Sequence, residues 1–449
     1  MKKPVLVWFR LDLRLEDNPA LLAAAESGSP VIPIFIWAPE EEEPWPPGAA
    51  SCWWLHQSLK SLQAFLDSQG SRLILRLGPT VATLKQLIAE TGANAVFWNR
   101  RYEPAIIARD AAVQKALDVE GIQVQSFNSA LLFEPWKPFQ VFSPFWRACL
   151  NQPEPAAPAA APERLPANFI WPDSLDLSDL RLEPQIDWAA GIRAAWTPGE
   201  AGSTSELELF LKNGLENYPS DRNRPDKRGT SRLSPHLHFG EISPRKIWHA
   251  LKNAKRTGTA EAVVSYLSEL GWREFAHHLL FHFPETTNKP LRSEFAAFPW
   301  RVDGALLKAW QSGRTGYPLV DAGMRELWTT GWMHNRVRMV VASFLTKHLR
   351  ISWEEGAYWF WDTLVDADLA NNTLGWQWTF GSGADAAPFF RIFNPTRQSE
   401  RFDPNRDYIR RWIPDLGGKD YPLPVVNHEQ ARREALASFE QMRKKSSAS

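Results

Sequence analysis

The first 130 residues alternate short apolar segments with longer amphipathic ones. The apolar segments have the length and residue content of buried strands, and they are Val5–Trp8, Val31–Trp37, Leu73–Leu77, Ala95–Trp98 and Ile122–Ser126. Helical patterns separate them, and the first has a clear start signal because Asp17 and Asn18 precede Pro19. Strands that alternate with helices form βαβ units, so this half predicts a doubly wound parallel sheet covered by helices on both faces.

After about Pro198 the apolar positions follow the period of a helix instead. The predicted helices are Ser205–Asn217, Pro244–Leu251, Ala260–His282, Gly304–Gln311, Val320–Thr330, Met333–Leu349, Trp353–Leu364 and Glu429–Arg443. This half therefore predicts an all-α domain.

A Pro/Ala-rich stretch at residues 151–168 lies between the two patterns. Such a composition propagates neither a helix nor a sheet and is typical of a connector on the surface. A chain of 449 residues also exceeds what one hydrophobic core usually organises. We predict an α/β domain over residues 1–130, a long connector over 131–197 and a helical domain over 198–449.

Composition narrows the class of protein. The sequence has no apolar run long enough to span a membrane, so we expect a cytoplasmic protein without a membrane anchor. Two cysteines cannot build a disulfide framework, and neither has zinc-site spacing. Fifty-one basic residues balance fifty-one acidic ones, so any nucleic-acid binding must depend on a local patch. The 23 tryptophans indicate an aromatic core, a stacking surface for flat ligands, or both.

One basic segment could hold an anion. Residues 218–234 place five cationic side chains around a Gly-Thr-Ser turn ahead of a predicted helix. Hydroxyls, free backbone N–H groups and guanidiniums together suit a pyrophosphate. A solvated basic loop would have the same composition. No GxGxxG or Walker-type loop follows any predicted strand, which argues against a classical dinucleotide or NTP site in the first half.

Two helical segments carry unusual polar content. Glu269, Trp272 and Arg273 lie at helical spacing and share one face, although a core tryptophan beside surface charges would give the same pattern. The segment 331–339 packs an amide, an imidazole and two guanidiniums into two turns of an otherwise apolar helix. Polar groups at that density need partners, from the protein or from a ligand.

The aspartates and asparagines of residues 366–372 could suggest a cation loop. The spacing lacks the central glycine and distal glutamate of an EF-hand, so calcium is not expected. The pairs His236/His238 and His277/His278 lack an HExxH context. We therefore predict no metal site.

These motifs resemble those of the DNA photolyase/cryptochrome family. The resemblance rests on WFRLDLRL at 8–15, GTSRLS at 229–234, WREF at 272–275, GWMHNR at 331–336, and DAD with GWQW within 366–378, in that order. Within the family the chain is most similar to bacterial, class III-like cyclobutane pyrimidine dimer photolyases, because of GYPLVDAGMRELW at 316–328.

The resemblance implies an α/β antenna domain, a connector and a helical domain that encloses FAD. By motif position, the cofactor-binding residues are Tyr218, Thr230, Ser231, Leu233, Ser234, Tyr266, Arg273, Asn335, Arg338, Asp366, Asp368 and Asn372. Arg338 and Asp366 would pair beside the flavin ring, and the amide of Asn372 would face flavin N5 and tune it.

The resemblance also implies a substrate, UV-damaged DNA containing cyclobutane pyrimidine dimers. The residues implied to meet the DNA are Arg222, Glu269, Trp272, Arg336, Met339 and Trp378, and those implied to act in catalysis are Glu269, Asn335, Met339 and Asn372. The expected reaction is splitting of the dimer by electron transfer from light-excited, reduced FAD, in a monomeric enzyme that meets DNA at the nucleoid.

A cryptochrome, a blue-light receptor without repair activity, is the alternative function. The sequence disfavours it because Asn372 replaces the acidic or thiol residue typical of sensory relatives, and because the chain ends without a long tail. A (6-4) photolyase is disfavoured because Asn335 follows His334 where such enzymes have adjacent histidines. A flavin-free DNA-binding module is a third possibility, which a coloured protein would refute.

Two further expectations follow from the resemblance. Trp300, Trp353 and Trp376 match the chain of tryptophans that carries electrons to oxidised flavin, although each could simply be a core aromatic. A second chromophore, methenyltetrahydrofolate, would contact Glu103 near the domain interface. Alternatively, Glu103 caps the helix that begins at Pro104.

Overall fold

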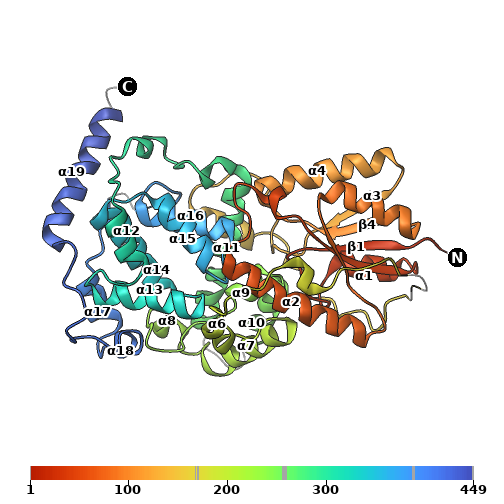
Figure 1. Cartoon of the computed structure of the whole chain (residues 1–449), viewed down its shortest axis with the longest axis horizontal. Helices are drawn as coiled ribbons and strands as arrows, with labels where there is room; N and C mark the ends of the chain where they lie inside the picture. Colours follow the sequence, from red (N-terminus) through yellow and green to blue (C-terminus); the bar gives the residue numbers. More distant parts are fainter. Residues whose placement is uncertain (1, 167, 169–170, 255–259, 387–389, 447–449) are drawn as a thin grey trace.

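The computed structural model describes residues 2–166, 168, 171–254, 260–386 and 390–446. Its two halves lie side by side along the long axis (Figure 1), with the sheet at the N-terminal end and a helical body at the other. Helix α19 (His428–Ser446) lies at the far edge of the helical body. The parts of the predicted connector and helical domain at 167, 169–170, 255–259, 387–389 and 447–449 lie outside the described residues.

The N-terminal half is a five-stranded parallel sheet in the order β3-β2-β1-β4-β5. The strands are β1 (Val5–Phe9), β2 (Val31–Trp37), β3 (Ile74–Leu77), β4 (Ala95–Asn99) and β5 (Gln123–Phe127). Each predicted strand is confirmed to within one residue at either end. The helices between them are α1 (Pro19–Glu26), α2 (Ala49–Ser68), α3 (Thr80–Thr91) and α4 (Pro104–Val119).

Both faces of this sheet are buried. Successive side chains of a strand point to opposite faces, and accordingly Val5, Val7 and Phe9 join one apolar cluster while Leu6 and Trp8 join another. The first cluster includes residues of α1 and α2, and the second includes residues of α3 and α4. The predicted start of α1 is also confirmed, because the side chain of Asn18 accepts a hydrogen bond from the backbone N–H of Leu21.

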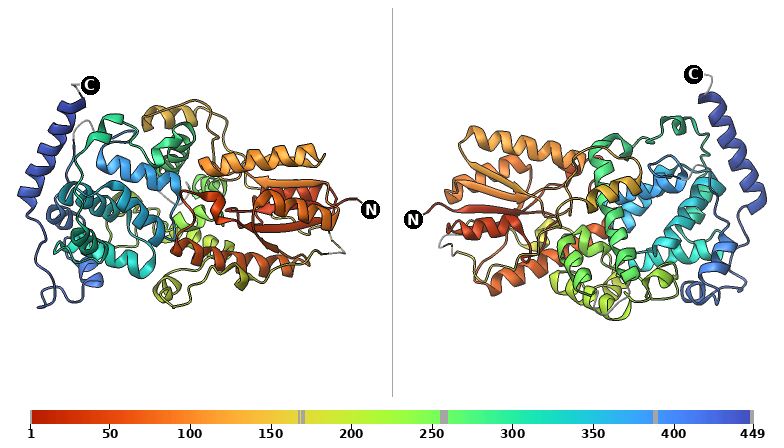
Figure 2. Two further views of the ribbon diagram at one scale, coloured as in Figure 1. Left: turned by 45° about the horizontal axis from the view of Figure 1, so that its top comes forward. Right: turned by 180° about the vertical axis from the view of Figure 1, so that it is seen from behind.

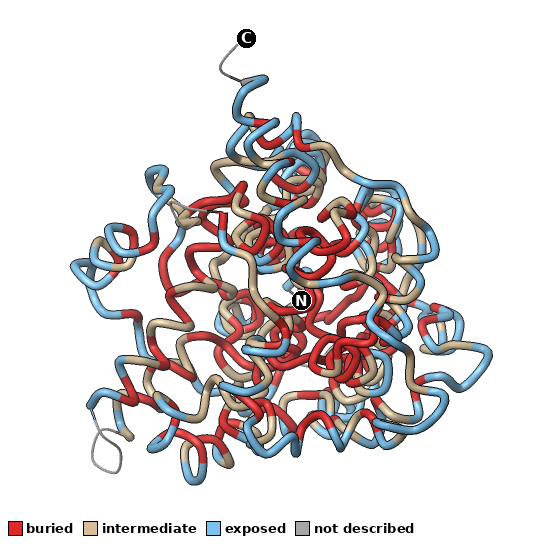
Figure 3. Tube along the Cα trace, turned by 90° about the vertical axis from the view of Figure 1, so that its left-hand side faces the viewer, coloured by how far each residue is buried: buried red, intermediate tan, exposed pale blue. Residues whose placement is uncertain are grey.

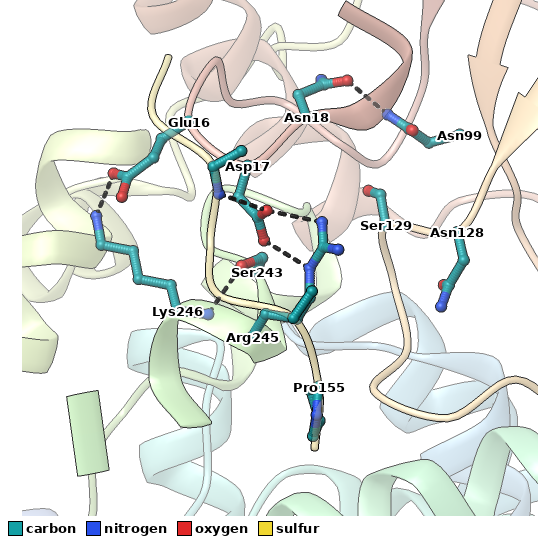
Figure 4. Close-up of polar contacts among 12 residues, drawn as sticks. Glu16, Asp17, Asn18, Asn99, Asn128, Ser129, Pro155, Ser243, Arg245 and Lys246 are labelled. Carbon is teal, nitrogen blue, oxygen red and sulfur yellow. Dashed lines mark hydrogen bonds and ion pairs between the residues drawn. The ribbon is translucent and has the colours of Figure 1, made fainter. Parts of the chain in front are cut away.

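A buried polar cluster joins the two halves (Figure 4). The carboxylate of Asp17 accepts two hydrogen bonds from the Arg245 guanidinium, at 3.0 and 2.7 Å, and a third from the backbone N–H of Ala159. Glu16 pairs with Lys246 at 2.6 Å. Arg245 and Lys246 belong to the helical half and Ala159 to the connector, so the loop after β1 holds all three parts together.

The C-terminal half is all-α, as predicted (Figure 2). Its helices are α7 (Glu200–Asn213), α8 (Tyr218–Asp221), α9 (Ser234–His238), α10 (Pro244–Ala254), α11 (Ala260–His282), α12 (Gly304–Gln311), α13 (Pro318–Thr330), α14 (Asn335–Ser343), α15 (Trp353–Thr363), α16 (Leu369–Phe380), α17 (Pro395–Phe402), α18 (Asp407–Trp412) and α19. Their inward faces form the large buried region that Figure 3 shows at the centre of this half.

The structure corrects the predicted bounds of two of these helices. The predicted helix Met333–Leu349 is helical from Asn335, where His334 caps its start, and becomes a π-helix over Phe344–Leu349. The predicted helix Ser205–Asn217 lies instead at Glu200–Asn213. The loop considered at residues 366–372 ends at Asp368, and residues 369–372 instead form the first turn of α16. Asp368 is the N-cap of α16, and the pattern of apolar residues did not reveal this helix because small, polar and aromatic residues occur on all its sides.

The span predicted as a connector contains helices of its own. They are α5 (Phe142–Leu150) and α6 (Ala190–Ala195), with a short 3-10 turn at Leu177–Leu180. Helix α5 packs against α11 and α6 packs against α13, so both lie on the helical half. None of the helices in the described ranges has the length and apolar composition needed to cross a membrane.

Candidate functional site

A cavity of about 550 Å³ opens within the helical half. It is lined by residues of α8, α9, α11, α14, α15 and α16 and of the loops between them. Every residue that the sequence assigned to the cofactor or to DNA lies on its wall. The fold thus brings together side chains from Tyr218 to Trp378.

The loop between α8 and α9 supplies hydroxyls and an unpaired cation to one wall. The hydroxyl of Tyr266 donates to Ser231 Oγ at 2.6 Å, and Trp332 Nε1 donates to Ser234 Oγ at 3.3 Å. Arg232 has a positive φ of 56° and its guanidinium stacks on Trp332. Neither Arg232 nor the hydroxyl of Thr230 makes a side-chain hydrogen bond to another described residue, so this wall retains polar groups that can bind an anion.

Helix α14 presents four of the predicted residues because of how it begins. His334 is its N-cap, and His334 Nδ1 accepts a hydrogen bond from the backbone N–H of Arg336 at 3.1 Å. Burial lowers the pKa of His334 to about 3, so the imidazole stays neutral and able to accept. The cap fixes the first turn of the helix, from which Asn335 and Arg336 reach the cavity. The side-chain amide of Asn335 has no hydrogen-bond partner among the described residues.

Arg338 and Asp366 form the ion pair that the sequence predicted. Arg338 Nη2 lies 2.8 and 3.0 Å from the two carboxylate oxygens of Asp366. The Nε–H of Arg338 donates to the carbonyl of Met333 at 2.7 Å, which fixes the plane of the guanidinium. The cavity is thus bounded by a rigid, paired charge.

Asp368 links the start of α16 to two histidines. One of its carboxylate oxygens accepts from the backbone N–H of Asn371 at 2.8 Å, and the other lies 3.4 Å from His277 Nε2 and 3.9 Å from His238 Nδ1. Burial opposes ionisation of Asp368, but His277 and His238 outweigh it and hold its pKa well below the usual range. One turn into α16, Asn372 Nδ2 donates to the carbonyl of Ala357, and its side-chain oxygen has no partner among the described residues.

On another wall, flat aromatic faces alternate with charges. Trp272 stacks on Phe142 with ring centroids 4.0 Å apart, and Trp378 Nε1 donates to the carbonyl of Asp385 at 3.2 Å. Glu269 pairs with Arg222 at 2.5 Å. Burial raises the pKa of the Glu269 carboxyl group, and the charge of Arg222 opposes this rise.

Arg336 is held at the rim by two neighbours. Its guanidinium donates to Asn223 Oδ1 at 3.2 and 2.6 Å and lies over the ring of Phe402 at 4.6 Å. Burial lowers the pKa of Arg336, and the charges of Arg222, Arg401 and Arg391 lower it further. Several cations therefore converge on this rim, and they form the local basic patch that a chain of zero net charge needs in order to bind nucleic acid.

Of the three tryptophans predicted to carry electrons, only Trp376 lines the cavity. Its ring lies so close to the backbone of α15 that a Cβ on Gly356 would come within 2.0 Å of it. Gly356 follows Trp353 by about one helical turn. Trp353 is buried and Trp300 is half-buried, and both pack in the same apolar core as Trp376.

Comparison with known proteins identifies the fold and the cavity. The models for DNA photolyase and for the FAD binding domain of DNA photolyase match residues 5–163 and 266–418. A deoxyribodipyrimidine photo-lyase of Agrobacterium fabrum is 48% identical, over 98% of each chain. The chain belongs to the DNA photolyase family.

Solved structures of relatives agree with this assignment. A bacterial class III photolyase from Agrobacterium tumefaciens matches with a TM-score of 0.96 and 48% identity, over 99% of this chain and 98% of that one. The chain is also similar to Cryptochrome-1 of Arabidopsis thaliana, with 40% identity over 97% of this chain and 70% of that protein's length. The predicted family and fold class are confirmed.

The cavity residues fit FAD, the cofactor of this family's FAD-binding domain. The wall with Thr230 and Arg232 offers a hydroxyl and a cation whose side chains make no hydrogen bond to another described residue, as a diphosphate requires. The side-chain oxygen of Asn372 and the amide of Asn335 likewise have no hydrogen-bond partner among the described residues. These groups are accessible from the cavity and are therefore available to bind a ligand.

Glu103 does not cap the helix that follows it, although it occupies the N-cap position of α4. Its carboxylate accepts hydrogen bonds from the Arg101 guanidinium, at 2.8 and 3.2 Å, and from the backbone N–H of Tyr102. Burial opposes ionisation, but Arg101 lowers the pKa of Glu103 to about 2. The alternative of a capping role was wrong, because the guanidinium of Arg101 competes for the same oxygens. Glu103 borders a cavity of about 30 Å³ between the two halves, and its contact with a chromophore stays a prediction.

Sequence reasoning missed several residues that border these cavities. Arg232 was counted among the cations of the basic segment but not assigned to the cofactor, and the structure places it on the cavity wall in contact with Trp332. A second cavity lies at the carboxyl ends of the strands, lined by Trp8, Arg10, Trp37, Arg101, Arg109 and Trp361 among others. The rule that open parallel sheets bind ligands at this edge could have directed attention to the residues directly after β1, β2 and β4.

Proposed function

We propose that this protein is a light-dependent DNA repair enzyme, a deoxyribodipyrimidine photo-lyase that splits cyclobutane pyrimidine dimers. The observation that carries the proposal is the single cavity that combines the cofactor-type wall of α14 and α16 with aromatic faces and a cationic rim. Two curated relatives that cover nearly the whole chain, from Agrobacterium fabrum and Synechococcus, carry that name.

FAD would be held by residues from four parts of the helical half. Tyr218, Thr230, Ser231, Leu233, Ser234 and Tyr266 would surround its phosphates and ribityl chain, while Arg273, Asn335, Arg338, Asp366, Asp368 and Asn372 would surround its ring system. The Arg338–Asp366 pair is already fixed by the carbonyl of Met333, so it can orient the ring without rearrangement. The free oxygen of Asn372 would accept a hydrogen bond from the ring.

The dimer would be extruded from the duplex into the part of the cavity bounded by Trp272 and Trp378. Extrusion costs less for a damaged pair than for intact bases, which gives selectivity. The indole faces would stack on the dimer, and Met339 would fill the remaining apolar wall. Glu269 and Asn335 would supply hydrogen bonds to the polar edges, while Arg222 and Arg336 would meet the flanking phosphates.

Reduced FAD, when bound and excited by light, would supply the electron that opens the cyclobutane ring and would receive it back. The protein's own part is to hold the dimer close, to exclude water and to place Glu269 within hydrogen-bond reach of the dimer. Glu269 lies on the cavity wall in an ion pair with Arg222, which supports that role.

The decisive experiment combines spectroscopy with repair. We expect the purified protein to show flavin absorption and, after chemical reduction, to restore an oligonucleotide carrying one thymine dimer under blue light but not in darkness. Flavin absorption with tight binding of the oligonucleotide but no repair would indicate a photoreceptor of the cryptochrome type. A colourless protein would overturn the proposal altogether.

For photoreduction, we propose the order Trp376, Trp353 and Trp300 from the flavin to the surface. The support is the position of Trp376 on the cavity wall and its tight packing beside Gly356, close to Trp353. Trp376→Phe should nearly stop light-driven reduction by an external donor, while chemically reduced enzyme continues to repair. If Trp376→Phe leaves photoreduction intact, or abolishes repair with FAD still bound, this role is wrong.

A second chromophore is also proposed, with methenyltetrahydrofolate as the first candidate and Glu103 as a contact. A related archaeal photolyase from Sulfolobus tokodaii, with a TM-score of 0.85 and 29% identity over 98% of this chain and all of that one, contains two FAD molecules. Release of FAD as the sole chromophore on denaturation, after expression with ample folate, would remove this proposal.

We propose that the enzyme acts on DNA, at the nucleoid, as a monomer. Sedimentation of the protein with and without a dimer-containing oligonucleotide tests the monomer, because a second protein copy in the complex would contradict it.

A further inference from the structure

A lysine without a carboxylate partner lies buried behind the cavity. Lys347 is 1% exposed and belongs to the π-helix that follows α14. No acidic side chain in the described ranges lies within ion-pair distance of its ammonium group. Burial, reinforced by the charge of Arg391, lowers the pKa of Lys347 to about 7. Because a buried cation without a counter-ion is unfavourable, its presence needs an explanation.

Three groups hold the Lys347 amine in place. It donates to the carbonyl of Thr379 at 2.9 Å and to the carbonyl of Arg391, and it lies 4.5 Å from the ring centroid of Phe390. Thr379 is in the last turn of α16, where unpaired carbonyls and the helix dipole favour a positive charge. An amine with at least two hydrogens can satisfy both carbonyls whether it is protonated or neutral.

These contacts join elements that are distant in the sequence. Lys347 comes from the π-helix, Thr379 from the end of α16, and Phe390 and Arg391 from the segment that precedes α17. A second bond from the same side supports this arrangement, because Ser343 Oγ accepts from the backbone N–H of Phe393 at 3.3 Å. The segment 390–393 is therefore fastened to the back of the helical core at two points.

The fastened parts lead to the rim and wall of the cavity. Thr379 and its neighbour Trp378 both line the cavity. Arg391 is exposed, and its charge acts on that of Arg336 at the rim. Displacement of segment 390–393 would therefore move a rim cation and loosen the end of α16 beside Trp378.

We propose that Lys347 is a positioning residue, which ties segment 390–393 to the end of α16 and thereby sets the geometry of the rim that receives DNA. The effect on DNA rests on the proposed repair function, whereas the tie itself does not. Lys347 is not itself part of the cavity wall, so it acts through the residues that it binds, Thr379 and Arg391.

The test compares Lys347→Met, which keeps the length of the side chain but removes the donor, with Lys347→Gln, which keeps two N–H donors. The matched control is Thr346→Val, because Thr346 is equally buried in the same π-helix and its hydroxyl donates only to the carbonyl of Ala342. All variants are first assayed for FAD content and for their absorption spectrum.

The first measurement is independent of DNA. Trypsin should cleave after the exposed Arg391 about tenfold faster in Lys347→Met than in the wild type, since cleavage follows the population of the open segment. Cleavage should be intermediate in Lys347→Gln and unchanged in Thr346→Val. Equal cleavage rates in the wild type and Lys347→Met would show that Lys347 does not hold segment 390–393 against the end of α16.

The second measurement is binding and repair of an oligonucleotide carrying one thymine dimer. Lys347→Met should raise the Kd about tenfold, the size of effect expected when the partners of buried hydrogen bonds are lost. The yield of repair per absorbed photon in the fully bound complex should stay unchanged, and Lys347→Gln should restore part of the affinity. An unchanged Kd despite faster cleavage would refute the link to the rim.

Failure of the wild type to prefer dimer-containing DNA would instead count against the proposed function, and the trypsin comparison would still decide the role of Lys347. If Lys347→Met does not fold, Lys347→Gln is compared with Thr346→Val instead. Faster cleavage and a higher Kd in Lys347→Gln would support the proposal, and equal values in the two variants would overturn it.

Discussion

The junction between the two halves and the cavity of the helical half use the same kinds of polar residue in different ways. At the junction, Asp17 accepts hydrogen bonds from Arg245 and Ala159, and Asn99 Nδ2 donates to Asn18 Oδ1 at 2.7 Å (Figure 4). On the cavity wall, Thr230 and Arg232 make no side-chain hydrogen bond to another described residue. The polar groups of the junction thus bind one another, whereas those of the cavity wall are available to a ligand.

This difference shows how buried charges can be interpreted. Removing one partner of a buried ion pair is unfavourable, because the other charge is then left buried without compensation. Polar groups on a cavity wall that make no hydrogen bond to the protein are instead available to a ligand. Residue type and burial alone therefore do not distinguish a structural cluster from a functional one. The hydrogen-bond and ion-pair partners of each polar atom must also be known.

The largest expected effect concerns the junction. Arg245→Ala should lower the free energy of unfolding by about 3–5 kcal/mol, because the buried carboxylate of Asp17 loses its charged partner. Urea unfolding followed by circular dichroism measures this change. The control is Arg410→Ala, whose exposed pair with Asp407 should contribute less than about 1 kcal/mol. A small loss of stability in Arg245→Ala, or weaker FAD binding in the folded variant, would contradict the distinction between the structural junction and the ligand-binding cavity.

The next effect concerns the cavity. Trp272→Ala should remove about 1–3 kcal/mol of the preference for dimer-containing over intact DNA, since one stacking face is lost. Titrations with the two oligonucleotides measure the preference, and the exposed Trp328 offers a control as Trp328→Ala. An equal loss of affinity for both DNAs would assign Trp272 to the scaffold instead.

Lys347 is intermediate between the paired charges of the junction and the unpaired polar groups of the cavity wall, because backbone carbonyls rather than an anion bind its amine. Its pKa is about 7 in the folded protein against 10.5 for a free lysine, so the unfolded chain binds more protons between these values. The stability of the wild type relative to Lys347→Met should thus rise by about 1 kcal/mol per pH unit from pH 7 to 10. Urea unfolding of both proteins across this range measures the difference, and a pH-independent difference would show that the amine is not desolvated. Thr346→Val should show no such trend.

The smallest effect is at the rim. Arg336→Ala should weaken binding of damaged and intact DNA alike and reduce the slope of log affinity against log salt by about 0.9. Arg193→Ala, on the surface of α6 and paired with Asp187, is the matched control. A loss confined to dimer-containing DNA would mean that Arg336 reads the lesion rather than the backbone.

Much of the fold could be predicted because local patterns determine it. The five strands alternate with helices, and the Asp17-Asn18-Pro19 signal marks the start of α1, as found. The helical spacing of Glu269, Trp272 and Arg273 placed all three on one face, and they do line one cavity. These features depend on neighbours within a few turns of chain, which the sequence displays directly.

The remaining features depend on contacts between distant segments, which no local pattern encodes. Helix α16 was not predicted, yet its packing against α11 and α15 is what places Asn372 and Trp376 at the cavity. Glu103 follows the sequence signal for a cap, but Arg101 takes its oxygens. The sequence alone determined the layers and the order of motifs. Only the tertiary structure decided which polar atoms are paired and which await a ligand, because hydrogen bonding and desolvation depend on groups brought together from across the chain.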